Sequence, residues 1–356
     1  MSPQLLPIIA FIATMAFIFV LRPLAIRIGL TDRPDTRKTH TGEVPLVGGV
    51  AIYLALLVVV LLDNHFGLPP IFGKASIHAF LTASGLLVLV GVLDDRSGLS
   101  PLLRFLAQVI AAMTMVFGAG SLFTDLGALT SDGSTLYLGL FGMPFTILVT
   151  VGVINAINMC DGLDGLSGNM TLVSFLGLGL ANTLWGSADH LPLLNVLSAG
   201  VIGFLTFNQR MWFRNKAWVF LGDAGSMMLG LALVWMAIDI SQGGSRAMSP
   251  SATAWFLAIP VFDTVTMIIR RISQGRSPFH ADAEHLHHLL VRLGFRVGQA
   301  IAMMCCLAAL GCAIGLALTY FAVPDPVVIG LFTATGFLYL AVIQWSWYRI
   351  HKQESA

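Results

Sequence analysis

The chain consists largely of apolar runs of about 20 residues, joined by short polar connections. A helix needs about 20 apolar residues to cross a hydrocarbon core about 30 Å thick, and in lipid it satisfies its own backbone hydrogen bonds. The alternating pattern of a transmembrane β-barrel is absent. We therefore predict an all-α, polytopic integral membrane protein. It should have about eleven transmembrane helices, over residues 4–22, 46–62, 77–93, 102–119, 142–158, 169–186, 191–208, 224–240, 252–270, 298–320 and 326–347.

The composition supports this class, because charged residues make up 10% of the chain against about 25% in a typical soluble domain. A net charge of +1 gives no reason to expect a nucleic-acid partner. The four cysteines form neither a CxxC pair nor a disulfide framework. The N-terminus lacks the basic start and the cleavage site of a signal peptide, so the first apolar run is predicted to be retained.

The basic residues lie on alternate connections between the predicted spans. All but two of the 19 basic residues, Lys74 and Arg246, fall on one set of connections. The positive-inside rule places that set in the cytosol, with the N-terminus outside and the C-terminus cytosolic. Twelve of the 18 acidic residues lie there too. We expect one transmembrane domain, 1–356, with its functional residues on cytosolic loops at roughly 23–45, 94–101, 158–168, 209–223 and 271–297.

Two neighbouring aspartates, Asp94 and Asp95, end the third predicted span. Adjacent carboxylates repel each other, and a cation or a metal-bound phosphate between them would relieve the repulsion. Ordinary interfacial charge, paired with Arg96 and Arg104, is the alternative.

A polar segment, residues 155–168 (NAINMCDGLDGLSG), joins two apolar runs. Polar groups at membrane depth are costly and usually face a water-filled cavity. Asp161 and Asp164 are three residues apart and would share a face of a helical turn. A solvated loop with helix caps is the alternative. Cys160, within this segment, is interpreted as a packing residue.

Asp223, in the sequence FLGDAGS, opens the eighth predicted span. A carboxylate is stabilised near the positive end of a helix. It could be an N-cap, or an oxygen ligand for Mg²⁺ with glycines that let phosphate approach.

Four of the nine histidines lie within residues 280–288, shortly after Arg271 and Arg276. Asp282, His285 and His288 are spaced by three and could share a helical face. Neither HExxH nor a Cys/His tetrad is present, so an anion site for diphosphate fits better than zinc.

A basic stretch that includes Lys38 and His40 precedes the second predicted span. It suits an anionic lipid headgroup, or it is a plain positive-inside signal. Asp263, after Pro260, is a further carboxylate inside an apolar run.

The motifs RKTHTGEVPLVGG, LDDRSG, NAINMCDGLDGLSG, FLGDAGS and PFHADAEHLHH occur in this order over roughly residues 22–296. Together they resemble the polyprenyl-phosphate N-acetylhexosamine-1-phosphate transferases, of glycosyltransferase family 4. The likeness is closer to the bacterial UDP-GlcNAc:undecaprenyl-phosphate GlcNAc-1-phosphate transferases than to the muramoyl-pentapeptide branch, which has adjacent histidines in a different setting. Many relatives carry a third acid after the paired aspartates, whereas Arg96, Ser97 and Gly98 follow here.

The resemblance implies transfer of GlcNAc 1-phosphate from UDP-GlcNAc to undecaprenyl phosphate, with release of UMP, at the cytosolic face of a bacterial inner membrane. It implies Mg²⁺, or Mn²⁺, as cofactor. The product would start a surface polysaccharide: O-antigen, common antigen or teichoic acid. Expected site residues are Asp94, Asp95, Asp161, Asp164 and His285 in catalysis; Lys38, His40, Asn155, Asn158, Arg271, Arg276, His287 and His288 in substrate binding; and Asp223 with Asp161 at the metal.

Several alternatives stay open at this stage. Another UDP-N-acetylhexosamine could be the donor, and the reaction could be a single displacement or pass through a covalent intermediate. The oligomeric state is open, a homodimer included. A secondary transporter is the rival from another class, since intramembrane carboxylates and Gly-interrupted helices occur there too. Against it, the acids cluster at one face and no inverted repeat is visible. A CDP-alcohol phosphotransferase would need a DGxxAR motif, which the chain lacks.

Overall fold

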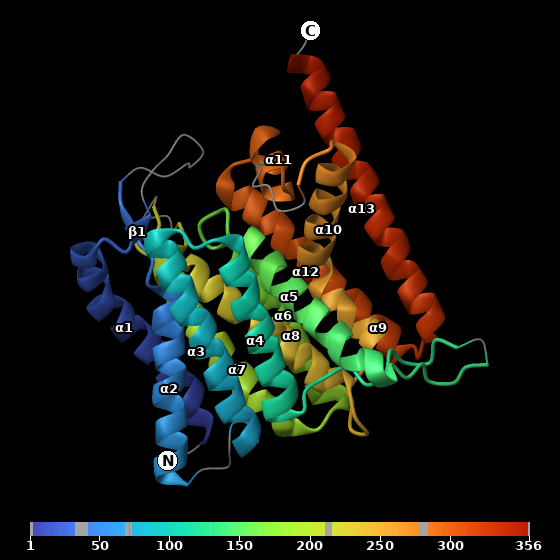
Figure 1. Cartoon of the computed structure of the whole chain (residues 1–356), viewed down its shortest axis with the longest axis horizontal. Helices are drawn as coiled ribbons and strands as arrows, with labels where there is room; N and C mark the ends of the chain where they lie inside the picture. The colour runs from blue at the N-terminus through green and yellow to red at the C-terminus, as the bar shows by residue number, and fades with distance from the viewer. Residues whose placement is uncertain are drawn as a thin grey trace.

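The computed structural model describes residues 3–32, 42–67, 71, 73–130, 132–210, 216–277 and 284–354. They form a bundle of helices that mostly alternate in direction (Figure 1). The helices are α1 (Leu6–Ile28), α2 (Gly48–Phe66), α3 (Lys74–Ser97), α4 (Pro101–Ala119), α5 (Gly142–Met159), α6 (Leu166–Trp185), α7 (Leu191–Asn208), α8 (Gly222–Ser241), α9 (Pro250–Thr253), α10 (Ala258–Ser273), α11 (Leu286–Arg292), α12 (Val297–Tyr320) and α13 (Asp325–Glu354). Short 3-10 turns are η1 (Pro3–Leu5), η2 (Gly139–Phe141), η3 (Ala188–His190) and η4 (Ala254–Leu257).

Within the described residues, ten segments are long and apolar enough to cross a membrane. They confirm the all-α, polytopic prediction and ten of its eleven spans. The predicted span 169–186 forms helix α6, but this helix is not among the ten. Polar side chains such as Thr171, Ser174 and Asn182 lower its apolar character, and all three are buried in the bundle. Packing against α7, α8 and α12 therefore replaces contact with lipid along much of α6.

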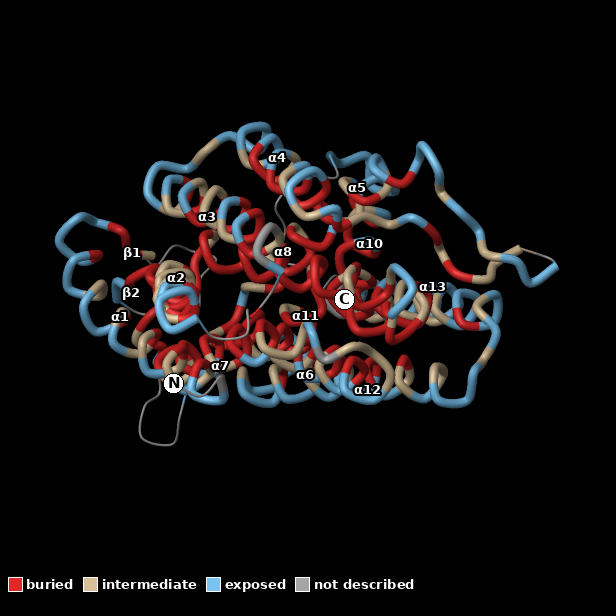
Figure 2. Tube along the Cα trace, turned by 90° about the horizontal axis from the view of Figure 1, so that it is seen from below, coloured by how far each residue is buried: buried red, intermediate tan, exposed pale blue. Residues whose placement is uncertain are grey.

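Helix α8 forms the centre of the bundle, with 94% of its most apolar stretch buried (Figure 2). It packs against α2, α3, α5 and α6. Glycines allow its first turn to touch two of these helices closely. A Cβ on Gly49 would lie 2.1 Å from the backbone nitrogen of Gly225, and a Cβ on Gly91 would lie 2.2 Å from that of Ala224. Backbone contact thus fixes the N-terminus of α8 against α2 and α3.

A two-stranded antiparallel sheet, which the all-α prediction did not include, pairs β1 (Thr31–Asp32) with β2 (Val44–Pro45). Phe220 donates its N–H to the Pro45 carbonyl over 2.8 Å, and Gly48 donates to the Phe220 carbonyl over 2.9 Å. The sheet therefore ties the approach to α2 to the approach to α8. Strands of two residues leave no apolar periodicity for a sequence pattern to reveal.

The alternation of the helices brings the motif segments to one end of the bundle, at the top of Figure 1. Helices α3, α5 and α10 end there, and α4, α6, α8 and α11 begin there. We call it the motif end.

Candidate active site

Arg104, at the start of α4, lies between two carboxylates at the motif end. Its Nη1 is 2.9 Å from Oδ2 of Asp94 and 3.7 Å from Oδ2 of Asp223. The other Asp94 oxygen accepts the Leu99 N–H over 2.6 Å. Asp94 is therefore held in place by its own helix end and by α4, and the pairing with Arg104 that the sequence offered as an alternative is present.

Asp95 makes a different contact from that of its neighbour. Both of its carboxylate oxygens lie 3.1 Å from the backbone nitrogen of Asp223, in the first turn of α8. Asp95 thus satisfies an N–H group that a helix start leaves without an intrahelical partner. The alternative that Asp223 is an N-cap is wrong, because Leu221 occupies that position and the Asp223 side chain accepts instead from Nδ2 of Asn158 over 2.8 Å.

Two asparagines of α5, Asn155 and Asn158, donate hydrogen bonds to α4 and α8. Asn158 also donates to Oγ of Ser226 over 2.9 Å. Asn155 donates to Oε1 of Gln108 over 2.7 Å, deeper in the bundle. Asn158 thus orients Asp223, whereas Asn155 binds another helix. The sequence analysis missed Gln108, although a lone amide in an apolar run is itself a signal.

Residues 160–165 form a turn rather than a helix, so the predicted shared helical face of Asp161 and Asp164 is wrong. Oδ1 of Asp161 accepts from Oγ of Ser167 over 2.5 Å, and Asp164 pairs with Nε of Arg210 at 2.7 Å. Gly165 adopts φ +90°, a conformation that glycine reaches at little cost.

Burial raises the pKa of Asp161 to about 6, and the charge of Asp164 adds to the rise while the Ser167 hydroxyl opposes it. Burial also raises the pKa of the Cys160 thiol well above its usual value. A buried, protonated thiol agrees with a packing residue rather than a nucleophile.

His285 precedes α11 and His288 lies within it, so these two residues do not share a helical face; Asp282 lies outside the described residues. His285 contacts Asp263, with Nδ1 2.7 Å from Oδ2. The ring of His287 lies 4.1 Å from that of His288, centroid to centroid, and 5.7 Å from that of His285.

His287 is 1% exposed and packs against the turn, where a Cβ on Gly162 would lie 2.2 Å from its Nε2. Neither ring nitrogen has a hydrogen-bond partner among the described residues. Burial, with the neighbouring imidazoles, lowers the pKa of His287 to about 3.

Two arginines, Arg270 in the last turn of α10 and Arg276 after the helix, lie beside one glutamate. Arg270 forms an ion pair with Glu284, and Nη1 of Arg276 is 3.7 Å from the same carboxylate. Arg271 is buried. Their expected role in holding diphosphate stays a prediction.

A cleft of about 760 Å³ opens at the motif end. The acids Asp95, Asp161, Asp164 and Asp223 line it, together with Asn158 and His288. Arg292 lines it as well, although the sequence analysis did not select this residue. The remaining lining residues are Asp32, Leu46, Gly162, Leu163, Asn208, Phe220, Leu221, Gly222, Val291 and Trp347. Lys38 and His40 lie outside the described residues.

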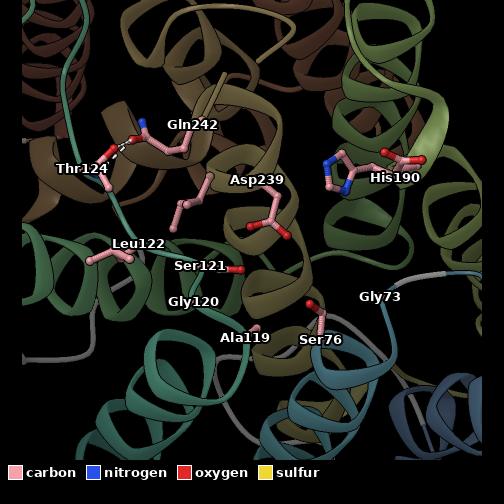
Figure 3. A pocket seen from close by; sticks show the side chains of 13 residues that line it. Gly73, Ser76, Ala119, Gly120, Ser121, Leu122, Thr124, His190, Asp239 and Gln242 are labelled. Atoms are coloured by element: carbon pink, nitrogen blue, oxygen red, sulfur yellow. Dashed lines mark hydrogen bonds between the residues drawn. The ribbon is translucent and has the colours of Figure 1, made fainter. Parts of the chain in front are cut away.

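A second cavity, of about 450 Å³, lies beside the other end of α8, where Asp239, His190, Ser121 and Gln242 line it (Figure 3). None of the expected site residues lines this cavity. Of the expected site residues that the structure describes, six line the cleft at the motif end: Asp95, Asn158, Asp161, Asp164, Asp223 and His288. The other six do not line it: Asp94, Asn155, Arg271, Arg276, His285 and His287.

The cleft suits a hard cation better than a soft one. No group of three His, Cys, Asp or Glu side chains converges as a complete metal site in the part of the chain that the structure describes. Mg²⁺ is usually bound by one or two carboxylates together with substrate phosphates. The carboxylates of Asp161 and Asp223 in one cleft fit that mode of binding.

The fold and the cleft define a polytopic membrane protein with an acidic site built from helix ends. Residues 77–241 match the family model described as glycosyl transferase family 4. The chain belongs to the polyprenyl-phosphate N-acetylhexosamine-1-phosphate transferases of this family and is a phospho-sugar transferase by homology.

Its relatives include three bacterial proteins named undecaprenyl-phosphate alpha-N-acetylglucosaminyl 1-phosphate transferase. The protein from Yersinia pestis is 35% identical over 354 residues, which cover 98% of this chain and 92% of the relative. Those from Salmonella typhi and Haemophilus influenzae are each 34% identical, over 95% of this chain and over 90% and 93% of their own lengths.

Proposed function

We propose that the protein transfers GlcNAc 1-phosphate from UDP-GlcNAc to undecaprenyl phosphate and releases UMP. The observation that carries the proposal is the cleft at the motif end, where Asp95, Asp161, Asp164 and Asp223 meet from three separate segments. The names of the relatives support this choice of donor and acceptor.

The chemistry exchanges one diphosphate for another. An oxygen of the lipid phosphate attacks the sugar-bearing phosphorus, and the bond from that phosphorus to the UMP oxygen breaks. The main obstacle is repulsion between two anions, so catalysis requires positioning and neutralisation of charge. Mg²⁺, or Mn²⁺, held by Asp223 and Asp161 would supply charge neutralisation at the diphosphate.

The aspartate pair has a positioning role in this proposal. A phosphate monoester has a second pKa near about 6 and is largely ionised at neutral pH. Little base strength is needed from Asp94 or Asp95. Asp94 holds Arg104 near Asp223, and Asp95 binds the backbone of Asp223. Asp164, which pairs with Arg210, and His288 line the same cleft and would face the substrates.

We further propose a single displacement rather than a covalent aspartyl-phosphate. The distinguishing experiment incubates the protein with UDP-GlcNAc and labelled UMP in the absence of any lipid phosphate. Exchange of label into UDP-GlcNAc requires a covalent enzyme and would overturn the single displacement.

We place the protein in a bacterial inner membrane with the motif end in the cytosol. The basic residues support this orientation, because all but Lys74 and Arg246 lie on the connections at that end. When a reporter is fused after Ala356, a reporter that works only in the cytosol should be active and one that works only in the periplasm should be inactive. An active periplasmic reporter would reverse the orientation.

In the decisive experiment, detergent-purified protein is incubated with undecaprenyl phosphate, Mg²⁺ and UDP-GlcNAc. The UDP-GlcNAc is labelled in both the sugar and the β-phosphate. Both labels should enter the lipid with an equal amount of UMP released. Release of UDP would instead identify a transferase of sugar without phosphate. UDP-GalNAc and other UDP-N-acetylhexosamines in parallel reactions decide the donor, and absence of turnover with all of them would reject the proposal.

A further inference from the structure

Asp263 of α10 is a fully buried carboxylate to which the proposed function assigns no role. Three donors surround it. Oδ2 lies 2.7 Å from Nδ1 of His285, and Oδ1 accepts from the backbone N–H of Leu286 over 3.0 Å and from the hydroxyl of Tyr339 over 2.9 Å. A buried carboxylate is tolerated when donors satisfy it in this way.

These contacts define which nitrogen of the His285 ring faces the carboxylate. An ionised carboxylate only accepts hydrogen bonds, so Nδ1 carries a proton. In the neutral imidazole the lone pair is then on Nε2. The bond from Leu286 fixes the backbone at the residue where α11 begins. Asp263 therefore fixes the tautomer of His285, the plane of its ring and the chain around it.

The orientation of the His285 ring affects the side chains between it and the cleft. The rings of His285 and His287 are stacked at 13° to each other, and His287 contacts His288, which lines the cleft. Because the three rings pack against one another, a displacement of the His285 ring would also displace the His287 and His288 rings.

Helix α13 contributes the remaining contacts. Besides the Tyr339 hydroxyl, the indole N–H of Trp347 donates to the Glu284 carbonyl over 2.9 Å, and Trp347 lines the cleft. The helix lies beyond the residues 77–241 that match the family model. The last span thus contacts the residues around His285 from a part of the chain in which the sequence analysis found no motif.

We propose that Asp263 and Tyr339 are positioning residues that hold His285, and through it His287 and His288, in the orientation that the transfer reaction requires. This inference rests on the proposed transferase function. It assigns no contact with substrate to either residue.

The test is Asp263→Asn, which keeps the shape of the side chain. Its Oδ1 can still accept from Leu286 and Tyr339, whereas its Nδ2 can only donate to Nδ1 of His285. The proton would therefore move to Nε2, and the lone pair would be lost there. We expect kcat to fall by about 100-fold or more, with KM for UDP-GlcNAc within about threefold and the melting temperature nearly unchanged.

A double-mutant cycle separates positioning from general damage. If Asp263 acts through His285, Asp263→Asn should cause almost no further loss in a His285→Gln background. Tyr339→Phe should give a smaller loss in kcat that likewise disappears in that background. Tyr348→Phe, an exposed position on the same helix, is the matched control and should be neutral. Losses that multiply in the double variants, or kcat for Asp263→Asn within about threefold, would overturn the proposal.

A second readout is independent of turnover. ¹⁵N NMR of histidine-labelled protein, at a pH that keeps imidazole neutral, should show the proton of His285 on Nδ1 in the wild type and on Nε2 in Asp263→Asn. An unchanged tautomer overturns the positioning role even where activity falls. If the wild type transfers nothing from any UDP-sugar while the tautomer still switches, the transferase proposal fails and the positioning of His285 stands.

Discussion

Replacing Gly91 by alanine tests whether the close contact between α3 and α8 sets the geometry of the cleft. The new Cβ would lie 2.2 Å from the backbone nitrogen of Ala224 and 2.6 Å from the carbonyl carbon of Asp223. Backbone atoms in the first turn of a helix cannot rotate away as a side chain does. To reach an ordinary contact of 3.4 Å, the two helices must separate by at least about 1 Å.

That separation breaks a defined interaction. Asp95 holds the Asp223 N–H at 3.1 Å, and an increase of about 1 Å leaves no hydrogen bond. Overpacking of this kind costs about 1–3 kcal/mol of stability. Misplacing groups in an active site by about 1 Å can reduce the rate about 100-fold. Gly91→Ala should therefore lower both the melting temperature and the rate of GlcNAc 1-phosphate transfer to lipid.

The matched control is Gly152→Ala in α5, where a Cβ meets no atom within 4 Å. Because alanine is the better helix former, this variant should keep its activity and gain slightly in stability. The reasoning is refuted if Gly91→Ala transfers phosphosugar within about threefold of the wild type and unfolds at the same temperature.

Three further predictions concern single groups and the metal. His287 has a pKa of about 3 in the folded protein against 6.5 without the fold, so the unfolded state binds more protons and stability falls as the pH drops through 6.5. This contribution amounts to about 2 kcal/mol between pH 7 and 5; His287→Gln should unfold with a weaker pH dependence, and equal dependence in the two proteins would refute the assignment. Asp223→Asn should lose more than about tenfold in kcat, a barrier increase above about 1.4 kcal/mol, while its thermal unfolding stays cooperative; activity within tenfold would reject its role as a ligand. Treatment with EDTA should abolish transfer and added Mg²⁺ should restore it, whereas full activity after chelation would exclude a dissociable metal.

The sequence predicted the fold well because lipid leaves a chain few solutions. Each apolar run became a helix, and the placement of the motifs at one end follows from alternation alone. Helix α6 differs because its polar side chains are buried against other helices, and a hydropathy pattern cannot distinguish that environment from water. The short sheet escaped prediction because it depends on pairing across the chain.

The candidate site was predicted less completely than the fold. Spacing by three suggested helical faces for Asp161 with Asp164 and for His285 with His288, but glycines turn the first segment and α11 begins after His285. Partners distant in sequence, such as Arg210 for Asp164 and Tyr339 for Asp263, carry no local signal. Residue types could therefore be selected from the motifs, while the contacts that orient them required the three-dimensional structure.

The burial of α8 has a consequence for the order in which the chain assembles. A span surrounded by other helices has no face suited to lipid, so it packs stably only after the neighbouring helices have been inserted. Helices α2, α3, α5 and α6 all precede α8 in the chain and leave the ribosome first. Synthesis thus delivers the central helix after most of the helices that pack against it, and α9, which also packs against it, follows in the chain. A circular permutation that moved α8 to the N-terminus would reverse this order, so that α8 would be synthesised before the helices that pack against it.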